Sequence, residues 1–162
     1  MKKILALSVI AAGVFFTACN NEAGGLSATA KKNMAANDSI MKAYERGDFS
    51  KMGDYIAADA VDHGGEQGDI VGLDNIVKEM KRYKEMMPDM KIVMMKTTAD
   101  DEYVYTWSEV KGTMMGKEMT MKSVDVTRFK DGKAAEHWVY MDPKDIMAMM
   151  PPMPADTTSM QK

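Results

Sequence analysis

The hydrophobic period of this sequence changes at Pro88. Before Pro88, apolar residues recur every three or four positions, as in a helix with one buried face. This stripe consists of Leu73, Ile76, Val77, Met80, Tyr83 and Met87. After Pro88, which cannot continue a helix, apolar residues alternate as in a strand, at Met90, Ile92 and Met94. The sequence therefore predicts a helix over residues 73–87 and a strand directly after it.

Helical patterns come first in the chain, and strand patterns come last. A first helix is predicted to end near Gly47 and a short second helix to begin near Ser50, before an extended segment over 58–63. Strand patterns cover 90–95, 103–111, 118–129 and 133–142, with a loop at 112–116 and a tight turn at 130–133. Three helical segments followed by four sequential strands cannot form βαβ units. We therefore predict an α+β fold, with an antiparallel sheet of four or more strands wrapped on three N-terminal helices.

Both ends of the chain are predicted to lie outside this domain. Lys2 and Lys3 precede an apolar run that stops at Cys19, and this segment resembles a bacterial lipoprotein signal. The resemblance implies cleavage before Cys19 and lipidation of its sulfur, which would anchor the protein to a membrane. An ordinary secretory signal with a chance cysteine is the alternative, and either signal implies export. We divide the chain into a signal (1–19), a flexible tether (20–32), a domain (33–142) and a Pro- and Met-rich tail (143–162).

Composition excludes several classes of function. A net charge of −3 argues against nucleic-acid binding, which needs a concentrated basic face. The single cysteine excludes an internal disulfide and a cysteine-cluster metal site, and the two histidines lack metal-ligand spacing. The 20 methionines fit an adaptable pocket wall or a drift of Leu and Ile positions to Met. A methionine-based sink for copper(I) or oxidants in the tail is a further alternative.

Asp125 is the strongest candidate for a functional residue. It lies between Val124 and Val126 in a predicted strand, where a carboxylate is unusual. In an apolar cavity such a carboxylate can take a proton from a carbon atom and return it. The alternative is an ion pair or a solvated sheet face. We expect His63 to assist at a substrate oxygen, the alternative being a structural or exposed histidine.

Aromatic residues and a second histidine are candidates for the pocket wall. His137 and Trp138 are neighbours on a predicted strand, so their side chains face opposite sides. We favour Trp138 for the wall because its large flat surface suits that place. Trp107 is a similar candidate, with core packing as the alternative, and Tyr44 and His137 complete the set.

An ordered set of short motifs resembles the SnoaL-like (ester cyclase) branch of the NTF2-like superfamily. The motifs are Tyr44–Phe49, Ala58–His63, Pro88–Met90, Val124–Phe129, Asp131–Lys133 and Glu136–Trp138. The resemblance implies a cone, in which a curved antiparallel sheet wraps around helices and encloses one deep pocket. It also implies the cofactor-free aldol chemistry of polyketide cyclases, with Asp125 as the acid/base and His63 as a matching histidine. The stretch Thr113–Lys117 lacks a further histidine that the family often carries in this hairpin loop.

These observations predict an exported, lipid-anchored domain that binds or transforms a small hydrophobic carbonyl compound without a metal or organic cofactor. The alternative is a non-catalytic ligand-binding or dimerisation module of the cell envelope. The resemblance implies that a homodimer can form through the outer face of the sheet. Contact with the membrane is expected through the lipid anchor alone.

Overall fold

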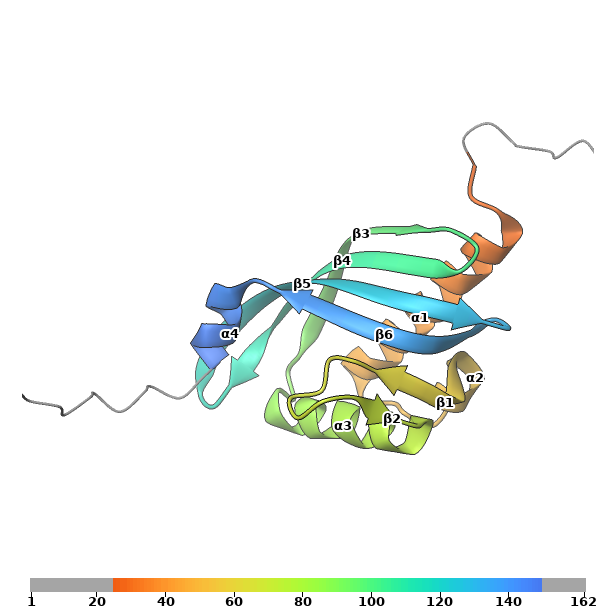
Figure 1. Cartoon of the computed structure of the whole chain (residues 1–162). Coiled ribbons are helices and arrows are strands. Elements are labelled where there is room, and N and C mark those ends of the chain that lie inside the picture. The colour runs from red at the N-terminus through yellow and green to blue at the C-terminus, as the bar shows by residue number, and fades with distance from the viewer. Residues whose placement is uncertain (1–24, 150–162) are drawn as a thin grey trace, which may run out of the picture.

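Six strands form one sheet in the computed structural model, which describes residues 25–149 (Figure 1). The strands are β1 (Ile56–Asp62), β2 (Ile70–Val71), β3 (Lys91–Ala99), β4 (Tyr103–Met114), β5 (Lys117–Lys130) and β6 (Lys133–Met141). The helices are α1 (Ala28–Arg46), α2 (Met52–Tyr55), α3 (Leu73–Met86) and α4 (Pro143–Met149). This architecture confirms the predicted α+β class. The expected signal with Cys19, and the tail beyond residue 149, lie outside the described residues.

The strand order is β2-β1-β6-β5-β4-β3, and it corrects the predicted topology in one respect. All neighbouring strands are antiparallel except β1 and β6, which pair in parallel with Asp62 opposite His137. The extended segment predicted over 58–63 corresponds to β1, and the short strand β2 follows it before α3. A parallel pair needs a long connection, which here runs through β2, α3 and β3–β5.

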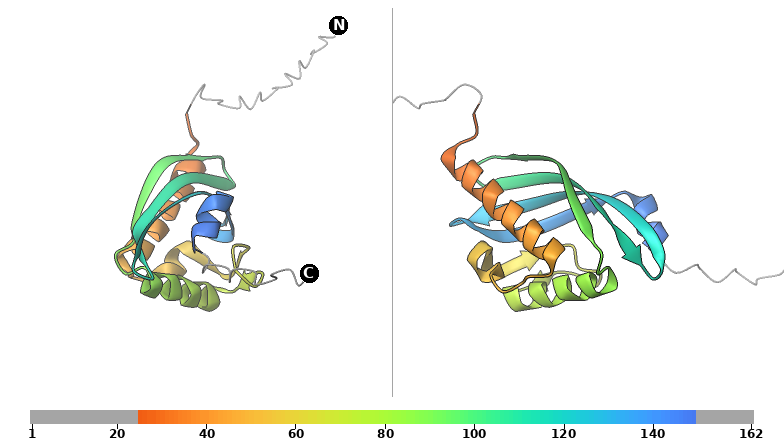
Figure 2. Two further views of the ribbon diagram at one scale, coloured as in Figure 1. Left: turned by 90° about the vertical axis from the view of Figure 1, so that its left-hand side faces the viewer. Right: turned by 180° about the vertical axis from the view of Figure 1, so that it is seen from behind.

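Helices α1 and α3 cover one face of the curved sheet (Figure 2). Helix α1 is fixed there by a buried amide: Asn37 Nδ2 donates to Thr106 Oγ1 at 3.1 Å, and Thr127 Oγ1 donates to Asn37 Oδ1 at 3.3 Å. Near the end of the helix, Glu45 Oε2 accepts a hydrogen bond from the Ile92 N–H at 2.9 Å. These contacts fix the position of α1 relative to β3, β4 and β5 on the concave face.

Two element boundaries differ from the sequence prediction. Helix α1 begins at Ala28 with Ser27 as its N-cap, so residues 28–32 belong to the helix rather than to the tether. Strand β4 continues to Met114, which reduces the predicted loop over 112–116 to a turn at Met115 and Gly116. Both turn residues have positive φ, 52° and 77°, as a tight hairpin turn requires.

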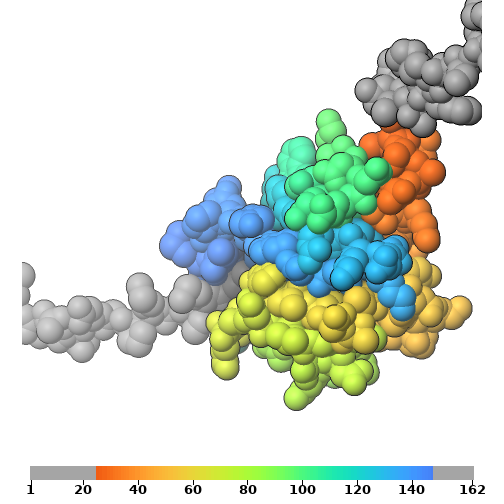
Figure 3. Space-filling model, turned by 45° about the vertical axis from the view of Figure 1, so that its right-hand side comes forward, coloured from red at the N-terminus to blue at the C-terminus, as the bar shows by residue number. Residues whose placement is uncertain are grey.

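Helix α4 stands out from the body of the domain after β6 (Figure 3). The Lys122 N–H donates to Asp145 Oδ2 at 3.0 Å, which ties α4 to β5 just beyond the end of β6. Among residues 25–149, no helix has both the length and the apolar character needed to cross a membrane.

Candidate functional site

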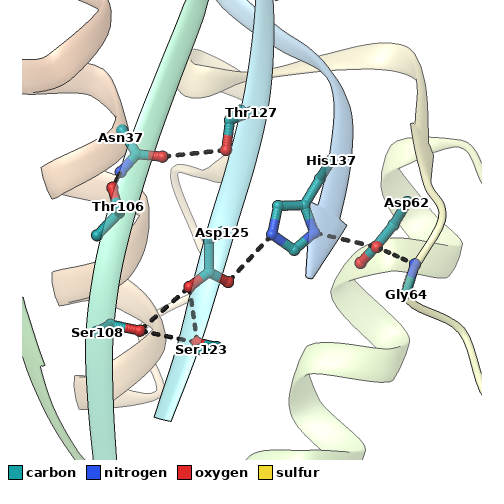
Figure 4. A network of polar contacts seen from close by, with 9 residues as sticks. All are labelled: Asn37, Asp62, Gly64, Thr106, Ser108, Ser123, Asp125, Thr127 and His137. Atoms are coloured by element: carbon teal, nitrogen blue, oxygen red, sulfur yellow. Dashed lines mark hydrogen bonds and ion pairs between the residues drawn. The ribbon is translucent and has the colours of Figure 1, made fainter. Parts of the chain in front are cut away.

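Asp125 lies in the middle of β5 with its side chain on the concave face of the sheet (Figure 4). It is only 8% exposed. Ser123 Oγ donates to Asp125 Oδ2 at 2.8 Å, and Ser108 Oγ on β4 donates to the same oxygen at 3.1 Å. The carboxylate therefore has hydroxyl partners on the sheet itself.

His137 joins Asp125 to a second carboxylate. Its Nε2 lies 3.3 Å from Asp125 Oδ1, and its Nδ1 lies 3.0 Å from Asp62 Oδ1 (Figure 4). Asp62 is the last residue of β1, and its Oδ1 also accepts the Gly64 N–H at 2.8 Å. Three strands thus contribute one residue each to an Asp62–His137–Asp125 chain.

The two carboxylates keep His137 charged at neutral pH. Burial alone would lower the pKa of His137, but its hydrogen bonds to Asp125 and Asp62 outweigh burial and raise the pKa to about 9. Burial acts to raise the pKa of Asp62. The hydrogen bonds from His137 and Gly64 together have a larger effect than burial, so the pKa of Asp62 lies below its usual value. The structure therefore places an imidazolium between two carboxylates.

A β-bulge decides which residue of β6 faces Asp125. At the hairpin turn Phe129 pairs with Ala134, but the next pair is Arg128 with Glu136, so β6 carries one extra residue, Ala135. This shift turns His137 toward the concave face and Trp138 toward the outer face. The expectation that Trp138 lines the pocket is therefore wrong, and His137 takes that place.

His63 lies outside the pocket, which corrects the role predicted for it. Its ring stacks on Trp138 at 4.8 Å between centroids, and its Nδ1 lies 3.0 Å from Asp69 Oδ1. Its Nε2 is buried 3.7 Å from Glu136 Oε2. His63 does not line the pocket and so cannot assist a substrate oxygen there.

Trp107 also lies away from the pocket. It pairs with Val124 on the outer face of the sheet and is 46% exposed. Its side chain neither lines the cavity nor packs in the core, so both readings from sequence are wrong for Trp107.

The concave face and the helices enclose a cavity of about 310 Å³. This volume is at the lower end of the range for small-molecule sites, ~300–1,000 Å³. Asp62, Asp125 and His137 contribute to its wall, and Tyr44 closes it from α1. Burial raises the pKa of Tyr44, so its hydroxyl stays protonated and can donate a hydrogen bond. Seven methionines complete the apolar part of the wall: Met41, Met80, Met87, Met90, Met114, Met121 and Met141.

Sequence reasoning missed Asp62, Ser108 and Ser123 as parts of this site. Ser108 and Ser123 are opposite one another on β4 and β5, and Ser123 is two residues from Asp125 on the same face. The period of the strand already places Ser123 on the same face as Asp125, and what it does not indicate is the hydrogen bond between them. Asp62 carries no comparable signal, because its position depends on the parallel pairing of β1 with β6. Among residues 25–149, no group of three or more His, Cys, Asp or Glu side chains is arranged to hold a metal ion.

The charge on His137 predicts a pH dependence of stability. Because the folded pKa is about 9 and the ordinary value is 6.5, the folded protein holds this proton more tightly than the unfolded chain. The stabilisation is complete below pH 6.5 and is lost as the pH rises to about 9. At ~1.4 kcal/mol per pKa unit, the free energy of unfolding should fall by roughly 3 kcal/mol across this interval. Urea unfolding at a series of pH values measures the fall.

The chain offers a matched control, since it has only two histidines. His137→Gln should be less stable at pH 6.5 and show a nearly flat profile up to pH 9. In His63→Gln the free energy of unfolding should fall with pH as steeply as in the unchanged protein. An equal slope in His137→Gln would show that another group causes the pH dependence.

Comparisons with known proteins agree with this architecture. A search of curated proteins finds no match. Among solved structures, a provisionally assigned SnoaL-like polyketide cyclase from Jannaschia sp. CCS1 superposes with a TM-score of 0.69 at 12% identity, covering 80% of this chain and 99% of that one. An LEH-like epoxide hydrolase from M. tuberculosis gives 0.64 at 16% identity, with 74% and 89% covered. An NTF2-like protein of unknown function from Burkholderia pseudomallei K96243 gives 0.65 at 18% identity, with 72% and 95% covered. The superpositions show a shared fold, and at these low identities they show the fold alone.

The sequence itself matches the family described as the SnoaL-like domain over residues 38–137. This match covers more than half of the chain, from α1 to His137 in β6. The chain therefore belongs to the SnoaL-like domain family, within the NTF2-like fold.

Proposed function

We propose that this domain binds a small apolar carbonyl compound in its cavity and transforms it by cofactor-free acid–base chemistry, with Asp125 as the base. The observation that carries the proposal is the position of Asp125. Its carboxylate is nearly buried, lines an otherwise largely apolar cavity, and is held by His137 and two serines. A fixed carboxylate in a confined space is suited to remove a proton from carbon.

The charges of the site support such a step. Asp125 would take the proton next to the carbonyl group, and the negative charge would move to the substrate oxygen as an enolate. The imidazolium of His137 remains in the site and stabilises negative charge on either side of the transfer. Tyr44, which stays protonated, can donate to the substrate oxygen from the helix side of the cavity. Asp125 would then return the proton.

Two of the three solved structures compared above are described by an activity. One is the polyketide cyclase assignment from Jannaschia sp. CCS1, and the other is the epoxide hydrolase from M. tuberculosis. Both descriptions concern small molecules. They support a small organic ligand for this chain, and proton transfer by a carboxylate is the chemistry that its own residues favour.

We further propose that the protein is exported and lipid-anchored through Cys19, as the signal-like segment indicates. Export would separate the protein from carrier-bound intermediates of the cytoplasm, which favours a free small molecule as the ligand. Cell fractionation tests the anchor, since Cys19→Ser should move the protein from the membrane to the soluble fraction. An unchanged distribution would contradict anchoring at Cys19.

A non-catalytic binding module is the second candidate, and one observation favours it. Both oxygens of Asp125 already have protein partners, because Oδ2 accepts from two serines and Oδ1 faces His137. A carboxylate held in this way can also serve only to fix the sheet and orient a ligand. Turnover separates the two candidates.

The outer face of the sheet supports the proposal of a homodimer. Large apolar side chains are exposed there at Tyr105, Trp107, Val124 and Tyr140, which is unusual for a surface that stays in water. A second copy would cover this face. Light scattering should give the mass of a dimer, and a monomer mass at high concentration would contradict this proposal.

Exchange of substrate protons tests the catalytic proposal. The simplest probe is butanone in deuterated water, with the loss of protons next to the carbonyl followed by NMR. Asp125→Asn should slow the exchange by roughly 100-fold or more, since a positioned general base contributes about 10²–10⁴-fold. Asp59→Asn, on the exposed side of β1, is the matched control and should leave the rate unchanged.

Two results would contradict the proposal. Exchange that survives Asp125→Asn would exclude Asp125 as the base. Butanone binding without any exchange in the unchanged protein would favour the binding module instead.

A further inference from the structure

The concave face of the sheet changes from polar to apolar along β5. Cross-strand partners form rows on this face. The row nearest the hairpin turn, Phe129 with Ala134, is apolar, and the next three rows carry polar groups: Thr127 with His137, Asp125 with Thr106, and Ser123 with Ser108. The next row is apolar, since Met121 pairs with Val110 and Val110 pairs with Ile92. The part of the cavity wall that β5 supplies therefore changes from polar groups, at Thr127, Asp125 and Ser123, to an apolar side chain at Met121.

The strand geometry gives the length of this gradient. Asp125 and Met121 are four residues apart on β5, both directed into the cavity. At ~3.4 Å per residue, they are separated by about 13 Å. A ligand that reaches both must therefore be extended.

Helix α1 follows the same gradient from the opposite side. Asn37 is bonded to Thr106 and Thr127 in the polar rows. Glu45, at the end of the helix, is bonded to Ile92 in the apolar row. Between them Met41 and Tyr44 line the cavity. Both walls therefore change from polar to apolar in the same direction.

Four methionines form the buried cluster at the apolar end. Met87, Met90, Met114 and Met121 are each less than 10% exposed, and they line the cavity from the segment between α3 and β3, from β4 and from β5. Methionine side chains are flexible and polarisable, so they can close around a thin apolar chain of variable length. They offer no strong hydrogen-bond donor, and of the side chains packed against them only Tyr44 carries a hydroxyl. A second oxygen among the methionines would therefore lose its water and find few partners.

We infer that the ligand is a straight-chain carbonyl compound, whose oxygen-bearing end lies at Asp125 and His137 and whose unbranched alkyl chain lies among these methionines. The inference rests on the proposed function for the carbonyl group and extends it to the rest of the molecule. The small volume of the cavity, about 310 Å³, agrees with one chain of moderate length. Rigid multi-ring compounds with several oxygens would place polar atoms against the methionines.

Binding of a series of methyl ketones tests this inference. Affinity for the full-length protein should rise roughly fourfold for each added methylene, the ratio that corresponds to ~0.8 kcal/mol per buried CH₂. The rise should stop when the chain fills the distance to the methionine cluster. Isomeric ketones with the carbonyl in the middle of the chain have the same composition but two short arms, and they should bind more weakly. Equal affinity of the two isomers, or no dependence on length, would overturn the inference.

Isotope-labelled methionine methyl groups locate the chain by NMR. Long ketones should shift the signals of Met114 and Met121, while butanone should leave them in place. Met95, which is 48% exposed, serves as the control and should not respond to either ligand. Shifts of the buried methionines that are equal for long and short ketones would contradict the assigned position of the chain.

A pair of valine variants gives the sharpest comparison. Val110→Phe narrows the apolar end, so the gain in affinity should stop at a shorter chain. Val93 is exposed on β3, so Val93→Phe should show the same dependence of affinity on chain length as the unchanged protein. An unchanged series in a folded Val110→Phe variant would contradict the inference.

The outcomes also separate this inference from the proposed function. Suppose that the exchange of butanone protons depends on Asp125 but that ketone affinity does not depend on chain length. The proposed function would then stand, and the inferred position of the alkyl chain would be overturned. If affinity depends on chain length but no ketone exchanges its protons, the inferred position of the alkyl chain would stand and the proposed catalysis would be contradicted.

Discussion

The imidazolium of His137, shared between Asp62 and Asp125, is the interaction on which the rest of the site depends. It joins β1, β6 and β5, which are far apart in the sequence but adjacent in the sheet. Partly buried charges are tolerated when they are paired, and removing one partner of a buried pair typically costs about 3–5 kcal/mol. The parallel pairing of β1 with β6 supplies Asp62, so the least regular feature of the sheet topology is also what keeps His137 charged.

The sequence predicts the order of the elements well because their hydrophobic periods are strong. The helix that ends before Pro88 and the hairpin around Asp131 and Gly132 both appear in the structure. Asp125 could also be selected, since a carboxylate between two valines is unusual in a strand. The choice between His137 and Trp138 failed for a specific reason. One extra residue, Ala135, reverses the faces of β6, and a bulge of this kind has no clear signal in the sequence.

The same reversal explains the position of Trp138, whereas Trp107 is on β4, which the bulge does not affect. Trp138 moves to the outer side, where His63 stacks on it, and Trp107 lies on the exposed outer face beside Val124. The cavity is lined instead by methionines and by polar groups that lie in register on β4–β6. Its chemistry therefore comes from strand register: carboxylate, imidazole and hydroxyl groups at one end, and thioethers at the other. A pocket of this composition favours a ligand with one polar end.

The charge state of His137 is the central claim, and an NMR titration of its ring tests it most directly. The measurement is simplest in His63→Gln, where His137 is the only histidine left. The structure predicts a pKa of about 9, and replacing Asp62 by Asn should lower it. A pKa at or below the ordinary value of 6.5 would show that the imidazole is neutral at physiological pH. It would contradict the charged Asp62–His137–Asp125 chain on which the proposed chemistry rests.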